Sequence, residues 1–199
     1  WIPKGMLFSL IAGTVLSLAL LLAFGIFGIG VGGKLRVVLG VVFGIAFVVC
    51  AKYTEWCVYA YRSFSYEGER KISKRIIDGT AEQITLPDGG VGLDIGCGSG
   101  ALTIACAKRN PQGKMVGIDR WGKEYASFSL PLCEKNAAAA GVKNASFRRG
   151  NAVKLDFPDE SFDAVTSNYV YHNITGADKQ ALLMETLRVL KKGGTFAIH

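Results

Sequence analysis

The sequence predicts an α/β fold, a doubly wound parallel sheet, preceded by a two-helix transmembrane hairpin. Three observations predict it: apolar residues are concentrated at the start of the 199-residue chain, strand-like and helix-like segments alternate after residue 85, and a glycine-rich turn follows the first strand. The chain is 50% hydrophobic and only 20% charged. About 138 residues remain for a soluble domain, enough for one core. The composition excludes a disordered, collagen-like or small disulfide-rich protein.

The membrane hairpin is expected over residues 1–61, with helices at about 6–31 and 36–58. Residues 6–31 contain no charged side chain and no histidine, and a helix of that length extends over roughly 39 Å, more than the roughly 30 Å of a hydrocarbon core. A second uncharged run at 37–51 covers only about 22 Å, so flanking side chains must reach the headgroups. A single span followed by a half-inserted helix is the alternative.

Basic residues beyond the second helix predict the orientation. They are Lys52, Arg62, Arg70, Lys71, Lys74 and Arg75. The turn holds only Lys34 and Arg36, which oppose this orientation. Because the larger positive cluster belongs inside, we expect an integral membrane protein with its soluble domain in the cytoplasm. The basic residues beside the hairpin are suited to binding the anionic headgroups of the lipid bilayer. The formal net charge of +7 therefore predicts no nucleic-acid partner. Five cysteines without C-x-x-C spacing predict reduced thiols and no metal site.

The remaining elements are predicted from the periodicity of apolar residues and from residues that end helices and strands. Residues 62–84 are expected to form a basic juxtamembrane amphipathic helix and linker, because isoleucines recur there at helical spacing. The soluble domain is expected at 85–199, with strands at 91–95, 115–118, 145–149, 162–167 and 195–199. Its helices are expected at about 101–109, through 137–140 and at about 177–190, the last stopped by two lysines and two glycines.

Such alternation predicts a parallel sheet with helices on both faces. Its ligand should lie at the carboxyl ends of the strands, where the strand order reverses. The chain begins with Trp1 and stops in the last expected strand, so we expect a fragment of a longer protein.

The glycine-rich turn lies at that edge. Gly96, Gly98 and Gly100 allow a tight bend and let a ligand approach the backbone. Gly96, Gly98 and Ala101 also satisfy the G-x-G-x-x-A pattern of dinucleotide sites. The turn therefore predicts a nucleotide-type ligand and leaves its identity open.

Two carboxylates narrow the choice. Asp119, at the end of the second strand, can accept hydrogen bonds from two ribose hydroxyls, which dinucleotides and adenosyl ligands both carry. Asp94, two residues before Gly96, would repel a pyrophosphate but suits a ligand with an ammonium group and a sulfonium cation.

Five stretches resemble the motifs of the class I S-adenosylmethionine-dependent methyltransferases. They are residues 93–100, 116–119, 150–152, 162–168 and 187–194. The resemblance runs from about residue 84 to 199 and leaves the hairpin unexplained. It implies a truncated, Rossmann-like class I methyltransferase fold without the family's last two strands. It also implies methyl transfer as the reaction and S-adenosyl-L-methionine as the cofactor.

The same resemblance implies a set of cofactor-binding residues. They are Asp94, Gly96, Cys97, Gly98, Gly100, Asp119, Arg120, Trp121, Asn151, Ala152 and Asn168. On the methionine side, the three glycines would line the ligand, Asp94 would lie near its amino group, and Asn168 would face the transferable methyl. On the adenosine side, Asp119 would hold the ribose hydroxyls.

Four further residues would surround the adenine. Arg120 and Trp121 stand where the family tends to place an adenine-packing side chain, and an ordinary packing role for Trp121 is the alternative. Asn151, where the family often has an acid, and Ala152 would flank the adenine.

Methyl transfer mainly requires alignment of the reactants and exclusion of water. A general base is needed only when the acceptor must lose a proton. Tyr169, Tyr171 and His172 follow the fourth strand and are candidates for that role or for substrate contact. A structural role for His172 is the alternative.

The sequence thus predicts a membrane-anchored, S-adenosylmethionine-dependent methyltransferase. Its acceptor is expected to be a small molecule, such as a lipid, a quinone-like compound or another amphipathic molecule delivered from the bilayer. Two alternatives are a non-catalytic, membrane-tethered module that binds S-adenosylmethionine and an NAD(P)-dependent oxidoreductase, which Asp94 opposes.

Overall fold

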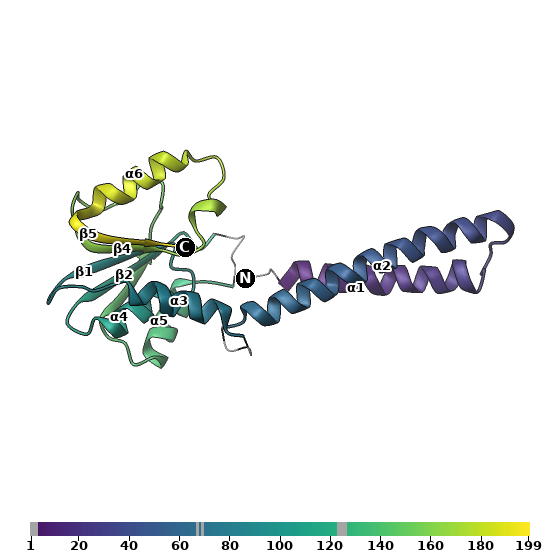
Figure 1. Cartoon of the computed structure of the whole chain (residues 1–199), viewed down its shortest axis with the longest axis horizontal. Helices are drawn as coiled ribbons and strands as arrows, with labels where there is room; N and C mark the ends of the chain where they lie inside the picture. Colours follow the sequence, from purple (N-terminus) through teal and green to yellow (C-terminus); the bar gives the residue numbers. More distant parts are fainter. Residues whose placement is uncertain (1–3, 67, 69, 123–126) are drawn as a thin grey trace. The chain divides into compact units, whose positions relative to one another are not determined.

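The computed structural model describes residues 4–66, 68, 70–122 and 127–199. The chain divides into two units, residues 1–74 and 75–199, which are described separately (Figure 1). The described ranges omit Trp1 and two positions of the expected linker.

The first unit holds two long apolar helices, as expected from the sequence. α1 (Lys4–Leu20) continues into a π-helical turn, η1 (Leu21–Ile26), and α2 (Gly33–Phe64) follows after a short turn. α2 extends beyond the predicted 36–58, because neither glycine nor proline interrupts residues 45–64. By length and composition, residues 5–26 and 33–64 are each long and apolar enough to cross a membrane.

These helices run antiparallel and contact each other through small residues. The hydroxyls of Thr14 and Thr54 are 3.0 Å apart and form a hydrogen bond. A Cβ added to Gly25 would lie 2.8 Å from the Cα of Gly40, so this crossing has no room for a side chain. Close backbone approach of this kind stabilises helix pairs in lipid.

Arg36 closes the turn between the two helices. Its Nε donates a hydrogen bond to the carbonyl of Gly25 at 3.0 Å, and its Nη2 donates to the carbonyl of Ile26. Carbonyls in the last turn of a helix lack intrahelical partners. The guanidinium therefore caps η1, which gives a structural reason for a charge in the turn.

The second unit contains a five-stranded parallel sheet in the order β3-β2-β1-β4-β5. The strands are β1 (Val91–Ile95), β2 (Lys114–Asp119), β3 (Ala145–Arg149), β4 (Phe162–Ser167) and β5 (Leu190–Ile198). The predicted doubly wound, Rossmann-like class I methyltransferase fold is confirmed. The strand order reverses between β1 and β4, where such sheets bind their ligands.

Helices cover both faces of this sheet. They are α3 (Ile72–Glu82), α4 (Ala101–Arg109), α5 (Leu130–Ala139) and α6 (Lys179–Val189), with a short 3-10 helix, η3 (Tyr171–Asn173). In Figure 1, α3, α4 and α5 lie on one face and α6 on the other. α5 begins before the predicted alanine run because Ser129 accepts a hydrogen bond from the backbone N–H of Leu132.

Apolar side chains fill the two layers between the sheet and its helices. One cluster includes Ile77, Ala81, Leu102, Cys106 and Met115, and the other includes Leu93, Ile95, Ile118, Val165 and Val189. Because side chains alternate along a strand, Leu93 and Ile95 share one face of β1 while Asp94 faces α4. A carboxyl group is thereby buried beneath the glycine-rich turn.

β5 begins earlier than the predicted strand. Leu190 pairs with Phe162, but the next pairing joins Thr195 to Ala164, so the intervening residues form an irregularity in the strand. Gly193 has φ +77° there, which favours glycine. The lysines and glycines that were expected to end α6 therefore lie within β5.

Candidate active site

The predicted site residues gather at the carboxyl edge of the sheet, on both sides of the point where the strand order reverses. Ile95 of β1 pairs with Ile118 of β2 and with Ser167 of β4. The turns that begin at Gly96 and Asn168 therefore start at the same level of the sheet. Parallel pairing brings these residues together although they are far apart in the sequence.

Glycine is required at two positions of the turn by conformation and by packing. Gly96 has φ +74°, and a Cβ on it would lie 2.3 Å from a methyl group of Val170. Gly100 has φ +81°, and its Cβ would lie 2.8 Å from the ring of Phe147. At Gly98, with φ +56°, the nearest side-chain atom would be 3.5 Å away. The first and last glycines thus accommodate the protein's own side chains, while Gly98 is less crowded.

Asp119 and Trp121 hold the middle of this turn. Asp119 Oδ2 accepts a hydrogen bond from the N–H of Gly98 at 2.9 Å, and its Oδ1 accepts one from the backbone N–H of Trp121 at 2.7 Å. The indole Nε1 of Trp121 donates to the carbonyl of Gly98 at 2.9 Å. Each carboxylate oxygen can accept more than one hydrogen bond, so Asp119 retains acceptor capacity for a ribose.

Asp94 is only 1% exposed and lies beneath the turn. Its Oδ2 accepts a hydrogen bond from the hydroxyl of Thr103 at 2.6 Å, and its Oδ1 accepts one from Thr166 at 3.0 Å. Burial raises the pKa of Asp94 to about 6, against the opposing effect of these hydrogen bonds. The nearby Asp119 raises this pKa further. The carboxyl group therefore changes its charge close to neutral pH.

Asn168, the first residue after β4, carries an unused hydrogen-bond acceptor. Within the part of the chain that the structure describes, its Oδ1 is the buried side-chain polar atom without a partner. An unsatisfied buried acceptor costs about 1–3 kcal/mol. A ligand that offers an N–H donor at this position would remove that cost.

The three candidate bases have different surroundings. The hydroxyl of Tyr171 hydrogen bonds with that of Thr186 on α6, and burial raises the pKa of Tyr171. Tyr169 lies with its hydroxyl 3.1 Å from Nε2 of His199. Burial also raises the pKa of Tyr169. His172 is exposed, with its ring centre 6.3 Å from that of Tyr169.

The methyltransferase domain family model matches residues 87–199, more than half of the chain. The chain belongs to the methyltransferase domain family. S-adenosyl-L-methionine is the methyl donor of this family, which confirms the predicted cofactor and decides against the dinucleotide alternative.

Individual relatives agree with this assignment. A demethylmenaquinone methyltransferase from Roseiflexus castenholzii is 37% identical over 111 residues, which are 56% of this chain and 42% of that protein. The chain thus spans less than half the length of the curated relatives it matches.

Solved structures show the same fold. The YcgJ protein of Bacillus subtilis aligns with a TM-score of 0.53 at 29% identity, covering 63% of this chain and 50% of that chain. The [4+2]-cyclase SpnF aligns with a TM-score of 0.55 at 26% identity, covering 65% and 45%. Because a cyclase shares the fold, the fold alone does not decide the reaction.

The described residues of the methyltransferase domain fit S-adenosylmethionine. The unpartnered Oδ1 of Asn168 can accept a hydrogen bond from the ammonium group of the methionine portion. The buried Asp94 beneath the same turn favours a cationic ligand over a pyrophosphate. When bound, the cofactor supplies a methyl group activated by a sulfonium.

The implied adenine-side residues of the methyltransferase domain lie at the same edge but are less enclosed. Arg120 and Asn151 are exposed, and Asn151 Oδ1 accepts a hydrogen bond from the N–H of Val153 at 3.0 Å. Ala152 packs against the apolar cluster around Ile118. Only the remaining hydrogen-bonding capacity of the Asn151 side chain is therefore available for an adenine.

Sequence reasoning missed two residues of this edge. His199 follows β5, and its side chain reaches Tyr169 because β5 is parallel to β4. Cys133 of α5 donates a hydrogen bond to the carbonyl of Gly98 at 3.2 Å. The predicted site residue Cys97 is buried beside Cys133, and their interaction raises the pKa of the Cys97 thiol. The position of His199 at the carboxyl end of the last predicted strand was a usable signal, whereas Cys133 offered none.

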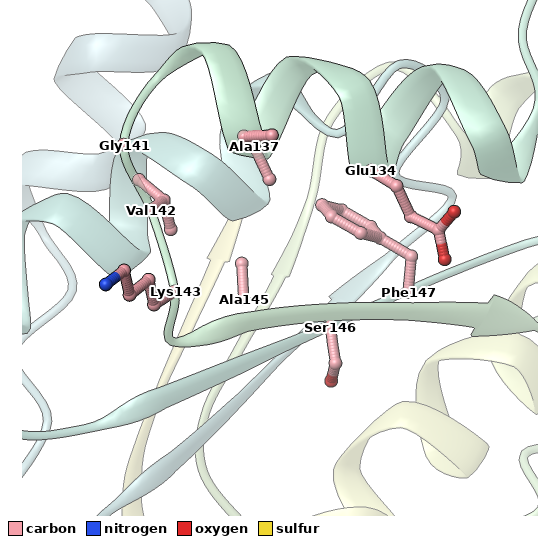
Figure 2. A pocket seen from close by; sticks show the side chains of 9 residues that line it. Glu134, Ala137, Gly141, Val142, Lys143, Ala145, Ser146 and Phe147 are labelled. Carbon is pink, nitrogen blue, oxygen red and sulfur yellow. The ribbon is translucent and has the colours of Figure 1, made fainter.

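A separate hollow of about 590 Å³ lies between α5 and β3 (Figure 2). Ala137 and Phe147 face into it, whereas Ser146 points to the other side of the strand. Glu134 and Lys143 are the charged residues among its lining side chains. None of the residues predicted to bind the cofactor lines this hollow.

Proposed function

We propose that the protein is a membrane-anchored methyltransferase that transfers a methyl group from S-adenosylmethionine to a hydrophobic or amphipathic acceptor dissolved in the bilayer. One observation carries the proposal: the same chain holds a methyltransferase domain and two apolar helices of membrane-spanning length. Large apolar side chains on these helices are exposed, such as Phe8 at 67% and Val37 at 66%. A protein covers an apolar surface of this extent with lipid or with a partner.

The names of the relatives support an acceptor of this class. Several are demethylmenaquinone methyltransferases, and a quinone is an apolar ring compound that partitions into lipid. An anchored enzyme meets such an acceptor by diffusion within the membrane plane. The basic residues that follow α2 favour a cytoplasmic position for the methyltransferase domain.

The site residues take the following roles in this proposal. Asp119 accepts hydrogen bonds from the ribose hydroxyls, and Asn168 accepts one from the methionine ammonium group. Asp94 favours the positive charge of the cofactor. A proton released by the acceptor passes to the Tyr169 oxygen as the Tyr169 hydroxyl gives its own proton to Nε2 of His199, 3.1 Å away, so the proton ends on the imidazole. Tyr171 is less suited to this role because its hydroxyl is already bound to Thr186.

The test uses the full chain reconstituted in lipid vesicles with methyl-labelled S-adenosylmethionine. An organic extract of membranes is incorporated in one sample, and a water-soluble extract of the same cells is added to another. We expect label in the organic phase of the first sample only. Label confined to the aqueous extract would contradict the proposed acceptor class. Cofactor binding without label in either phase would indicate a non-catalytic module.

Two variants complete the vesicle assay. Tyr169→Phe should bind the cofactor normally but transfer little label, because the hydroxyl that contacts His199 is lost. Tyr171→Phe is the matched control and should retain both binding and transfer. Equal transfer by the two variants would contradict the role of Tyr169.

A further inference from the structure

A closed set of hydrogen bonds joins three residues at the middle of the glycine-rich turn. Asp119 accepts from the N–H of Gly98 and from the backbone N–H of Trp121. The indole N–H of Trp121 then donates to the carbonyl of Gly98. Gly98 is thus held at both its N–H and its carbonyl, by two residues that follow one another closely at the end of β2.

Gly98 is the point of the turn that most needs such restraint. Without a Cβ, its backbone has access to many conformations, and here it adopts φ +56°. Packing against Val170 and Phe147 limits the first and last glycines, whereas the nearest side-chain atom to a Cβ on Gly98 would be 3.5 Å away. Gly98 is therefore restrained by the hydrogen bonds that its backbone N–H and carbonyl make.

Trp121 itself adopts a costly conformation to make these contacts. Its φ of +45° lies in the left-handed region, which is unfavourable for a non-glycine residue. Such a conformation persists only where the surroundings determine it. Here the backbone N–H of Trp121 is bound to Asp119 and the indole N–H to Gly98, so both ends of the residue are fixed.

We propose that Trp121 is a positioning residue whose indole N–H holds the Gly98 peptide in the orientation that receives S-adenosylmethionine, before the cofactor binds. This role differs from packing against the adenine, which uses the face of the ring and not its N–H group. The Cys133 thiol is a second donor to the same carbonyl, at 3.2 Å. Thiols are weak donors, so the indole provides most of the restraint.

Replacement of Trp121 by phenylalanine separates the two roles, because the ring face is kept and the donor is lost. We expect Trp121→Phe in the full chain in detergent micelles to bind S-adenosylmethionine about tenfold more weakly, measured by calorimetry. Trp121→Ala should show a similar loss. In the cofactor-free protein, Trp121→Phe should also speed amide hydrogen exchange in the glycine-rich turn.

Trp56→Phe makes the same chemical change on an exposed residue of α2 and should alter neither binding nor exchange. If Trp121→Phe binds the cofactor as tightly as the unmodified chain while Trp121→Ala does not, the indole acts by packing and the proposal is wrong. A variant that fails to fold is replaced by β-(3-benzothienyl)alanine at position 121, which keeps the shape of the indole and lacks only the N–H. Unchanged affinity in that protein would overturn the proposal as well.

Discussion

The two sides of the active-site edge differ in how far their polar groups are already satisfied. On the side of β1 and β2, Asp94 and Asp119 each accept two hydrogen bonds, and both polar groups of Gly98 are bound. On the side of β4 and β5, Asn168 keeps a buried acceptor without a partner, and His172 is exposed. The first side is organised by the protein itself, whereas the second includes the Asn168 acceptor, which no described residue uses.

This difference indicates that the two sides of the site have different roles in ligand binding. A site organised in advance loses less conformational entropy when its ligand binds. The side of β1 and β2 is therefore suited to a cofactor that is the same in every reaction cycle. The side of β4 and β5 is suited to contacts that form with the bound cofactor and the acceptor.

Asp119→Ala should have the largest effect on the organised side. It removes the charged acceptor of the Gly98 N–H and of the proposed ribose contacts, and hydrogen bonds to charged groups contribute about 1.5–3 kcal/mol. We expect calorimetry to show an affinity for S-adenosylmethionine lower by about thirtyfold or more. Unchanged affinity would show that Asp119 does not organise the site.

Asp163→Ala is the matched control for this variant. Asp163 also binds a backbone N–H, that of Val91, and pairs with Lys191, but it lies at the amino ends of the strands. Its removal should lower the melting temperature without changing the affinity for the cofactor.

Asp94→Asn should produce opposite effects on stability and on binding. The ordinary pKa of the carboxyl group is 3.8, and burial raises it to about 6 in the folded chain. Between about pH 4 and pH 6 the unfolded chain releases this proton while the folded chain keeps it, so the contribution of Asp94 to stability falls as the pH rises. By pH 7 that loss is complete, on the order of 3 kcal/mol.

The asparagine variant should therefore lose this pH dependence and melt at a higher temperature near pH 7. Its affinity for S-adenosylmethionine should fall by about tenfold, because the charge that favours the cationic ligand is absent. In the unmodified chain, affinity should decrease as the pH falls below 6, when Asp94 becomes protonated. Thermal melts and calorimetry at pH 5 and pH 7 test both effects, and a variant that retains full affinity would contradict the role of Asp94.

The sequence contained enough information to predict the sheet and to place most of the candidate site residues at its carboxyl edge. Strands at 91–95 and 162–167 were predicted with the bounds that the structure shows, because apolar residues there lie between clear turn signals. Parallel order then places every strand end at one edge. Asp119 could be assigned to this edge from its place at the end of the second predicted strand, whereas the role of Asn168 came from the family resemblance.

Contacts that depend on exact backbone conformation were not predictable. The hydrogen bond from Trp121 to Gly98 joins two residues with positive φ, and nothing in the residue pattern predicts this conformation for a tryptophan. Arg36 caps η1 only because that segment ends in a π-helical turn. Local pattern predicts which elements form, but it does not determine which donor meets which acceptor between them.

Asn168→Ala should have the smallest effect on stability. Whether this variant lowers the melting temperature tests the contrast between the two sides of the site. Asn168 has an unused buried acceptor, so its removal should leave the melting temperature of the cofactor-free protein unchanged or slightly higher. Asn144→Ala is the matched control, because the side-chain amide of Asn144 donates to the carbonyls of Ala107, Asn110 and Gly113. That control should lower the melting temperature and leave cofactor affinity unchanged. Asn168→Ala should instead weaken S-adenosylmethionine binding severalfold, since the ammonium group loses an acceptor. If Asn168→Ala destabilises the cofactor-free chain as much as Asn144→Ala does, the carboxyl edge beyond β4 is already satisfied without a ligand, and the contrast between the two sides disappears.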